Sequence, residues 1–212
     1  MAEGERTVED RLREEYFQLL PDVRRLTGHL VSQINYHLLP ILSSLESYEQ
    51  LVVRSRIKEC ESAVDALRRR EEGATFDRER PDRYSLANLN DLAAVRILVF
   101  PRKRIRQVDD ALRKIFPAWT SDPVTIDEEV QGLKYHGYSR TSQRIRGEYQ
   151  IVSMLVGLFW DVEHSALYKP LPQLKGVALP RMMRQRRREV FHVLEAFEDE
   201  FERMIDGATP AH

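Results

Sequence analysis

The stretch DLAAVRILVF, residues 91–100, decides the fold that this sequence predicts. From Ala93 to Phe100 it is almost wholly apolar and has the length of a strand, which is typical of a strand buried on both faces of a sheet. Pro101 ends this run, because proline cannot donate to the ladder of hydrogen bonds. An amphipathic helix is expected next, with apolar residues at helical spacing: Ile105, Val108, Ala111, Leu112 and Ile115.

Further strands are expected before and after this one. Residues 51–58 begin with β-branched side chains and then alternate, which favours a strand with basic residues on one face: Arg54, Arg56 and Lys58. The segments 138–145 and 148–152 favour two more strands with a turn at Gly147, and a short strand is expected at 124–126. The expected sheet therefore joins parts of the chain that lie far apart in the sequence.

Helical patterns precede and follow these strands. Residues 8–50 carry apolar side chains at three- and four-residue steps, and Pro21 and Pro40 are expected to start or bend helices there. A helix over 62–70 is expected to take Ser62 as its N-cap.

The last part of the chain continues as helix. Residues 153–168 are helical in composition, and a proline-containing linker then leads to a long final helix that ends near Ile205. The sequence thus predicts an α+β fold in which a small mixed sheet is flanked by helices. We expect a helical region at residues 1–45, a central domain at 46–170, and a linker with the C-terminal helix at 171–212.

The bulk composition excludes several classes of protein. The chain has 212 residues, with 33 Lys and Arg against 34 Asp and Glu, so no overall charge attracts it to nucleic acid or membrane. Cys60 is the single cysteine, which fits a reducing compartment. The charged N-terminus resembles no secretory signal, and no apolar run is long enough to cross a bilayer. We therefore expect a cytoplasmic protein with no membrane partner.

A phosphate site is the first chemical hypothesis. Arg56 and Lys58 share a strand face and run into the helix that Ser62 is expected to start. A helix N-terminus attracts anions through its free N–H groups and its dipole, and two cations add to this attraction. The alternative is an exposed edge strand that carries solvated charges.

Two acids and a tyrosine are the other candidates. Asp91 precedes the buried strand and Glu148 lies on another, and Mg²⁺ commonly takes one or two carboxylates together with substrate phosphates. The alternatives are a turn residue for Asp91 and a surface residue for Glu148. Tyr138 follows Gly137 and is a candidate for stacking on a base, or else a half-buried structural tyrosine. No histidine or cysteine spacing supports a zinc site, and no P-loop is present.

Together these motifs resemble the RelA/SpoT-type synthetase domain, which makes the alarmone (p)ppGpp. The family pattern runs Arg-x-Lys-x-x-x-Ser, Asp-[Leu/Ile]-Ala-Gly-[Val/Ile]-Arg, Gly-Tyr-x-Ser-x-His, Glu-Ile-Gln-Ile-Arg-Thr and His-x-x-x-Tyr-Lys. The resemblance covers about residues 45–170. This chain carries the following residues of the pattern: Arg56, Lys58, Ser62, Asp91, Leu92, Ala93, Val95, Arg96, Gly137, Tyr138, Glu148, Gln150, Ile151, His164, Tyr168 and Lys169.

The resemblance implies a nucleotidyltransferase-like fold and a Mg²⁺-dependent pyrophosphokinase. Such enzymes move the β,γ-pyrophosphate of ATP onto the 3′-hydroxyl of GDP or GTP. By this resemblance, Arg56 and Arg96 would stack on the two faces of adenine, and Lys58 and Ser62 would contact the ATP phosphates.

The resemblance also implies the catalytic and acceptor residues. Asp91 and Glu148 would hold Mg²⁺, and Glu148 would in addition orient or deprotonate the acceptor hydroxyl. The acceptor nucleotide would contact His136, Tyr138 and Gln150, with the tyrosine stacked on guanine.

The chain departs from the family pattern at several positions. Ala66 stands where a lysine is usual, His136 replaces an asparagine, Arg140 and Ser142 replace a serine and a histidine, and Val152 replaces an arginine. These changes leave three hypotheses open: a (p)ppGpp synthetase with a remodelled acceptor pocket, the same transfer to another acceptor such as the 3′ end of tRNA, or a nucleotide-binding domain without turnover.

The final helix suggests self-association. Its start is rich in arginine and its end is rich in acids, so two copies packed antiparallel would match opposite charges. A coiled-coil-like seam is formed by Val190, Leu194, Phe197, Phe201 and Met204. We expect a homo-oligomer that shares this seam. The alternatives are that the seam packs on its own domain, or that the arginines contact RNA.

Overall fold

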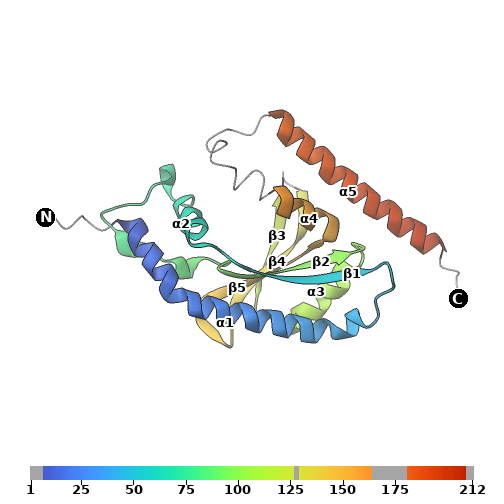
Figure 1. Ribbon diagram of the computed structural model, residues 1–212, viewed down its shortest axis with the longest axis horizontal. Coiled ribbons are helices and arrows are strands. Elements are labelled where there is room, and N and C mark those ends of the chain that lie inside the picture. The colour runs from blue at the N-terminus through green and yellow to red at the C-terminus, as the bar shows by residue number, and fades with distance from the viewer. Residues whose placement is uncertain (1–6, 127–128, 164–180, 209–212) are drawn as a thin grey trace.

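A computed structural model describes residues 7–126, 129–163 and 181–208 of the chain. Figure 1 shows its helices and strands. In chain order they are α1 (Val8–Leu42), β1 (Gln50–Ile57), α2 (Cys60–Arg68), β2 (Ala93–Phe100), α3 (Arg104–Ile115), β3 (Thr120–Ile126), β4 (Glu129–Ser139), β5 (Ser142–Ser153), α4 (Met154–Glu163) and α5 (Arg181–Ala208). Three short 3₁₀ turns lie between α2 and β2.

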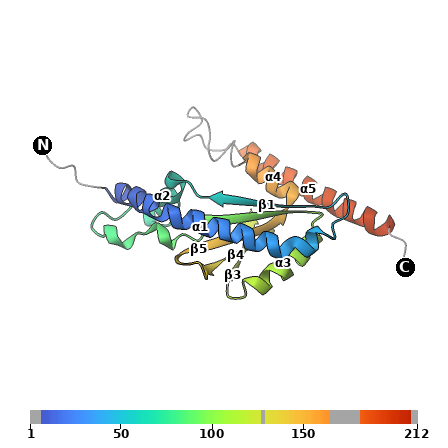
Figure 2. The same cartoon turned by 60° about the horizontal axis from the view of Figure 1, so that its bottom comes forward.

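The five strands form one mixed sheet in the order β1-β2-β5-β4-β3. The central pair, β2 and β5, is parallel, and the other neighbours are antiparallel. Helices α1 and α3 cover one face, whereas α4 and α5 lie on the other (Figures 1 and 2). This architecture confirms the predicted α+β fold with a small mixed sheet, while the expected domain boundaries stay a prediction.

The main core lies between the sheet and α1. Val95 and Ile97 of β2 point to this side together with Tyr149 of β5, and all of them join a buried cluster that includes Leu26 and Leu30 of α1. A second, smaller core lies on the opposite face, where α4 and α5 pack over the far ends of β2 and β5: Leu98, Val152, Val156, Trp160 and Phe191. The rest of that second face is polar, and this is where the candidate site lies.

Helix α1 shows that neither Pro21 nor Pro40 starts a helix, which was one of the two predictions for these prolines. It is one element of 35 residues with Pro21 and Pro40 inside it. Both prolines are exposed, while Leu19, Leu26 and Leu30 on the opposite side are buried. The continuous apolar contact with the sheet offsets the backbone hydrogen bonds that the prolines remove.

The β4–β5 hairpin corrects the prediction of a turn at Gly147. The turn lies at residues 140–141, and Gly147 sits within β5. A Cβ atom on Gly147 would come within 2.7 Å of Leu30 Cδ1, so the glycine serves close packing of α1 on the sheet. Gly137 plays the same part in β4, where a Cβ would meet the ring of Trp119 at 2.6 Å.

The start of α2 also differs from the prediction. The N-cap is Glu59, and its side chain makes no capping hydrogen bond, while Ser62 is the third residue of the helix. The helix begins earlier because β1 ends at Ile57, so Lys58 and Glu59 alone make the connection.

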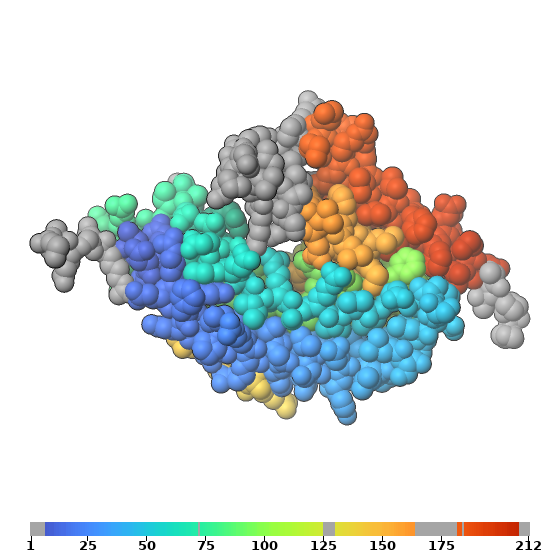
Figure 3. Space-filling view, viewed as in Figure 1, coloured from blue at the N-terminus to red at the C-terminus, as the bar shows by residue number. Residues whose placement is uncertain are grey.

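Helix α5 packs on its own chain along part of the expected seam. Phe201 contacts Tyr48 and Phe100, with ring centroids 5.7 and 5.1 Å apart. Val190, Phe197 and Met204 are exposed instead. Figure 3 shows α5 as a separate ridge on this side of the molecule.

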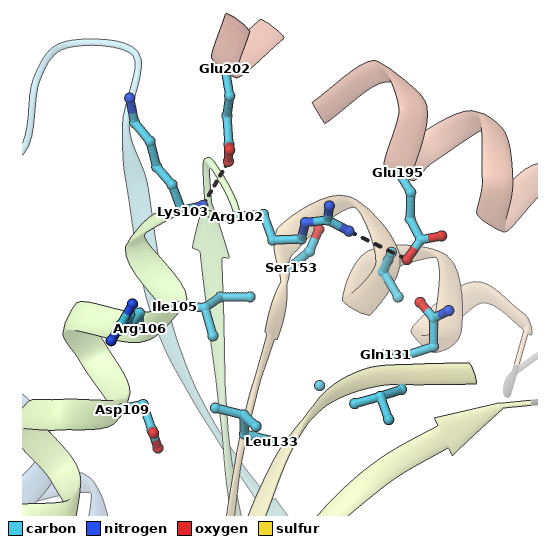
Figure 4. A pocket seen from close by; sticks show the side chains of 13 residues that line it. Arg102, Lys103, Ile105, Arg106, Asp109, Gln131, Leu133, Ser153, Glu195 and Glu202 are labelled. Carbon is cyan, nitrogen blue, oxygen red and sulfur yellow. Dashed lines mark hydrogen bonds and ion pairs between the residues drawn. The ribbon is translucent and has the colours of Figure 1, made fainter. Parts of the chain in front are cut away.

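Charge complementarity holds α5 against the start of α3. Arg102 pairs with Asp199 at 2.5 Å and with Glu195 at 3.5 Å, and the backbone N–H of Lys103 donates to Glu202 at 2.6 Å. These contacts border a cavity of about 500 Å³ between α3, β4 and α5 (Figure 4). None of the predicted site residues lines this cavity. Among the described helices, none is long and apolar enough to cross a membrane.

Candidate active site

The strand register gathers the predicted site residues on the open, polar face of the sheet. Residues that pair across neighbouring strands project to the same face. One row contains Arg56, Ala94, Glu148 and His136, and the next contains Arg54, Arg96, Gln150 and Lys134. Segments that are far apart in sequence therefore bring their polar side chains to one surface.

Lys58 and Asp91 lie at the edge of this face, where β1 ends and β2 is about to begin. The backbone N–H of Lys58 donates to the carbonyl of Leu92 at 3.1 Å, which extends the β1–β2 ladder by one bond. The ammonium group of Lys58 forms an ion pair with the carboxylate of Asp91. Because Lys58 is buried, this pairing satisfies a charge that would otherwise be costly.

Glu148 is the most unusual group in the site. Only 5% of its surface is exposed, and burial raises the pKa of its carboxyl group. The negative charge of Asp91 raises this pKa further. Gln150 Nε2 donates to Glu148 Oε1 at 2.7 Å and acts in the opposite direction, together with the charges of Lys134 and Lys58.

Arg96 is held at several points. Its Nη1 bonds Asp161 Oδ1 at 2.7 Å, its Nε donates to Gln150 Oε1 at 3.2 Å, and its guanidinium lies 5.6 Å from the ring centroid of Trp160. Burial lowers the pKa of Arg96, and Asp161 opposes that change. Arg54, opposite Arg96 on β1, bonds the other oxygen of Asp161 at 3.0 Å.

Arg56 lies near the end of β1, and Ser62 lies in the first turn of α2. Arg56 is exposed and makes no ion pair with the described part of the chain. Ser62 is half-buried in the first turn of α2. Because no side chain caps this nine-residue helix, the first N–H groups of α2 lack a side-chain acceptor beside Lys58. An anion would be favoured there.

The predicted acceptor residues line the other side of Glu148. His136 pairs with Glu148 across β4 and β5, its Nδ1 is buried without a hydrogen-bond partner, and burial with nearby Arg146 lowers its pKa. Tyr138 is 47% exposed and lies 5.2 Å from the Arg146 guanidinium. Trp119 fixes this end of β4, since its Nε1 donates to the carbonyl of Tyr138 at 3.1 Å.

The residues present suit a magnesium ion held together with phosphates. Within the described ranges, no group of three or more histidine, cysteine, aspartate or glutamate side chains is placed to hold a metal alone. Asp91 and Glu148 supply two carboxylates, which matches the usual protein share of a Mg²⁺–nucleotide site. The mutual repulsion that raises the pKa of Glu148 is what a divalent cation would relieve.

Three residues of the site were not predicted from the sequence: Asp161, Trp160 and Lys134. All three contact or influence the predicted residues. The period-2 pattern of β4 was the available signal for Lys134, whereas Asp161 belongs to a helix whose orientation only the tertiary structure gives. His164, Tyr168 and Lys169 of the family pattern lie outside the described residues.

Solved structures with the same fold come from bacterial nucleotide enzymes. Small alarmone synthetase 1 from Bacillus subtilis matches with a TM-score of 0.64 and 17% identity, over 92% of this chain and 100% of that one. A second structure of the B. subtilis enzyme, bound to its product pppGpp, matches with a TM-score of 0.65 and 15% identity, over 93% of this chain and 100% of that one. A GTP pyrophosphokinase family protein from Streptococcus pneumoniae matches with a TM-score of 0.60 and 19% identity, over 91% of this chain and 94% of that one.

The chain has the small alarmone synthetase fold. No family model and no curated protein sequence matches it. The likeness therefore lies in the arrangement of helices and strands, and identities of 15 to 19% leave substrate and acceptor to be argued from the site. On that fold, the open sheet face described above carries the polar residues.

Proposed function

We propose that this protein is a Mg²⁺-dependent pyrophosphokinase that transfers the β,γ-pyrophosphate of ATP to the 3′-hydroxyl of GDP or GTP. The observation that carries the proposal is that two acids lie at one end of a cationic sheet face, with Asp91 just before β2 and Glu148 on β5 opposite Ala94. Three arginines and a lysine border the acids: Arg54, Arg56, Arg96 and Lys58. Phosphoryl-type transfer needs this kind of positioning and charge neutralisation.

The donor nucleotide would lie across β1 and β2. Arg56 and Arg96 would stack on adenine, since a guanidinium plane interacts well with an aromatic face. Lys58 and the uncapped N-terminus of α2, with Ser62 in its first turn, would bind the phosphates.

Asp91 and Glu148 would hold the metal ion, which supplies charge neutralisation between the donor phosphates and the two carboxylates. Lys58, now paired with Asp91, would turn part of its charge toward the phosphates. Glu148 would also accept or orient the proton of the attacking hydroxyl.

The acceptor nucleotide would lie on the β4 side of Glu148. Tyr138 is exposed enough to stack on a base, and Gln150 and His136 flank the acid from the neighbouring positions. The B. subtilis enzyme, whose structures include one bound to AMPCPP and one bound to its product pppGpp, lends support to nucleotide substrates.

Product analysis tests the proposal. The protein is incubated with Mg²⁺ and ATP labelled in the β,γ-phosphates, together with GDP, GTP or tRNA. We expect labelled (p)ppGpp from GDP or GTP. Label on tRNA would show that tRNA, and not GDP or GTP, is the acceptor. No transfer to any of the three would indicate a nucleotide-binding domain without turnover.

Glu148→Gln tests the role of the acid. We expect transfer to fall by at least a hundredfold, the usual scale for loss of an acid–base group, with ATP binding largely kept. Glu189→Gln, at a half-exposed position on α5, is the matched control and should retain wild-type turnover. Wild-type turnover in Glu148→Gln would remove the assignment of both metal and base.

A further inference from the structure

Three arginines crowd the donor side of the sheet face. Arg54 and Arg96 stand directly opposite each other on β1 and β2, and Arg56 follows two residues after Arg54. Like charges that face each other across an antiparallel pair are destabilising. The positive charge of Arg56 also opposes ionisation of Arg96 and lowers its pKa. Without a counter-charge, these side chains would separate and turn toward solvent.

Asp161 of α4 supplies that counter-charge. Its two oxygens are divided between the facing arginines, with Oδ2 bonded to Arg54 at 3.0 Å and Oδ1 bonded to Arg96 at 2.7 Å. Gln150 and Trp160 complete the surroundings of Arg96. The guanidinium is thus fixed at its edge by Asp161 and Gln150 and lies against an indole ring.

An arginine fixed in this way is prepared for stacking. A free arginine side chain loses rotamer freedom when it is immobilised, which weakens any contact that it makes. A guanidinium that is already held by its edge keeps its plane defined and has little further freedom to lose. Bonds at the edge leave the side of the guanidinium away from Trp160 for a base.

We propose that Asp161 is a positioning residue that fixes Arg96 for recognition of the purine base of the donor nucleotide and keeps Arg54 beside it. The inference rests on the proposed function, because it needs a base at Arg96. Asp161 touches neither the reacting phosphates nor the acceptor in this arrangement; it acts through the arginine.

The charge of Asp161 has a second effect that must be separated from the first. A carboxylate near the donor site repels phosphates, so its removal strengthens the attraction for any polyanion. A ligand that has the phosphates but no base isolates this term. The ratio of the two affinities then reports the contribution of the base alone.

The experiment measures binding of Mg²⁺–AMPCPP and Mg²⁺–tripolyphosphate to wild-type protein and to Asp161→Asn by titration calorimetry. The substitution keeps the shape of the side chain and removes its charge. Asp122→Asn is the matched control, because Asp122 pairs with Lys134 at 2.5 Å in the same cross-strand row, at the far edge of the sheet. Circular dichroism checks that each variant is folded.

We expect the preference for AMPCPP over tripolyphosphate to fall about tenfold in Asp161→Asn and to stay unchanged in Asp122→Asn. An unchanged preference in Asp161→Asn, or an equal fall in both variants, would overturn the inference while leaving the proposed donor site in place. If the wild-type protein binds both ligands equally, the donor assignment itself fails and the inference falls with it.

Discussion

At Glu148 the fold holds a carboxylate out of water and beside a second negative charge. Burial and Asp91 both raise its pKa above the ordinary value of 4.5. The folded protein therefore binds a proton at Glu148 more tightly than the unfolded chain does. The stabilising effect of this proton is complete below about pH 4.5 and is lost as pH rises through the higher pKa of the folded state.

The pH dependence of stability should show the destabilising effect of ionising the buried Glu148 carboxyl group. Without metal, wild-type protein and Glu148→Gln should differ least near pH 4, and the variant should gain in relative melting temperature as pH rises toward 8, by a few degrees. Added Mg²⁺ with AMPCPP should stabilise both proteins and reduce the difference between them at pH 8, because the cation would relieve the repulsion between the acids of the wild type. Thermal unfolding followed by circular dichroism measures both effects. A difference that does not vary with pH would contradict the assignment of the buried charge.

Among the elements, the β4–β5 hairpin depends on two glycines that accept aromatic and aliphatic neighbours. The Trp119 ring occupies the space above Gly137 and is itself fixed by its hydrogen bond to the Tyr138 carbonyl. The centroid of this ring also lies 4.6 Å from that of the Phe116 ring, so the indole has little room to move aside.

Gly137→Ala should therefore destabilise the protein by about 1–3 kcal/mol through overpacking. Gly28→Ala is the matched control: nothing lies within 4 Å of the added methyl group, and alanine should stabilise α1 by about 0.5–1 kcal/mol. Urea unfolding measures both. If both variants lose stability equally, close packing at Gly137 is not the reason for the glycine.

The elements also show which features a sequence can predict. The strand at residues 93–100 was predicted with its correct bounds, because a strand buried on both faces has a continuous apolar pattern. Gly147 was wrongly taken as a turn, since its real partner, Leu30, lies more than a hundred residues earlier in the chain. Pro21 and Pro40 were expected to start or bend helices, and both lie inside the single helix α1.

The candidate site divides in the same way. Arg56, Lys58, Asp91 and Glu148 stood out because local pattern and family resemblance both marked them. Asp161 did not, since its partners lie on β1 and β2 and nothing in the sequence of α4 indicates which side of the helix faces the sheet. Contacts between distant elements are the part that local patterns do not contain.

In the whole molecule, the charge pattern of α5 is largely matched within the chain. Its acidic half binds Arg102 and Lys103, and Arg187 from its basic half pairs with Glu163 at 2.8 Å. This removes part of the electrostatic reason for an antiparallel pair of copies. Self-association through α5 stays a prediction, and it would now depend on the apolar side chains that α5 leaves exposed: Val190, Val193, Phe197 and Met204.

Substitution of Val193 and Phe197 by glutamate tests that surface directly. We expect the mass measured by light scattering to fall toward that of one chain, 24.9 kDa, because the exposed apolar face is lost. His192→Glu, a neighbouring exposed polar position, is the control and should keep the wild-type mass. Reversal of Arg187 would be a poorer test, since it also breaks the contact with Glu163. A wild-type protein that already has the mass of one chain would refute the oligomer.

The parallel pairing of β2 with β5 has a consequence for biosynthesis. Three elements, α3, β3 and β4, lie between β2 and β5 in the chain, so all of them must be synthesised before Glu148 reaches its place beside Ala94. A growing polypeptide that has left the ribosome only as far as β4 lacks Glu148, and so lacks one of the two carboxylates of the proposed metal site. The proposed transfer would therefore wait until β5 has been synthesised, and a protease cut before β5 followed by loss of the C-terminal fragment would end it.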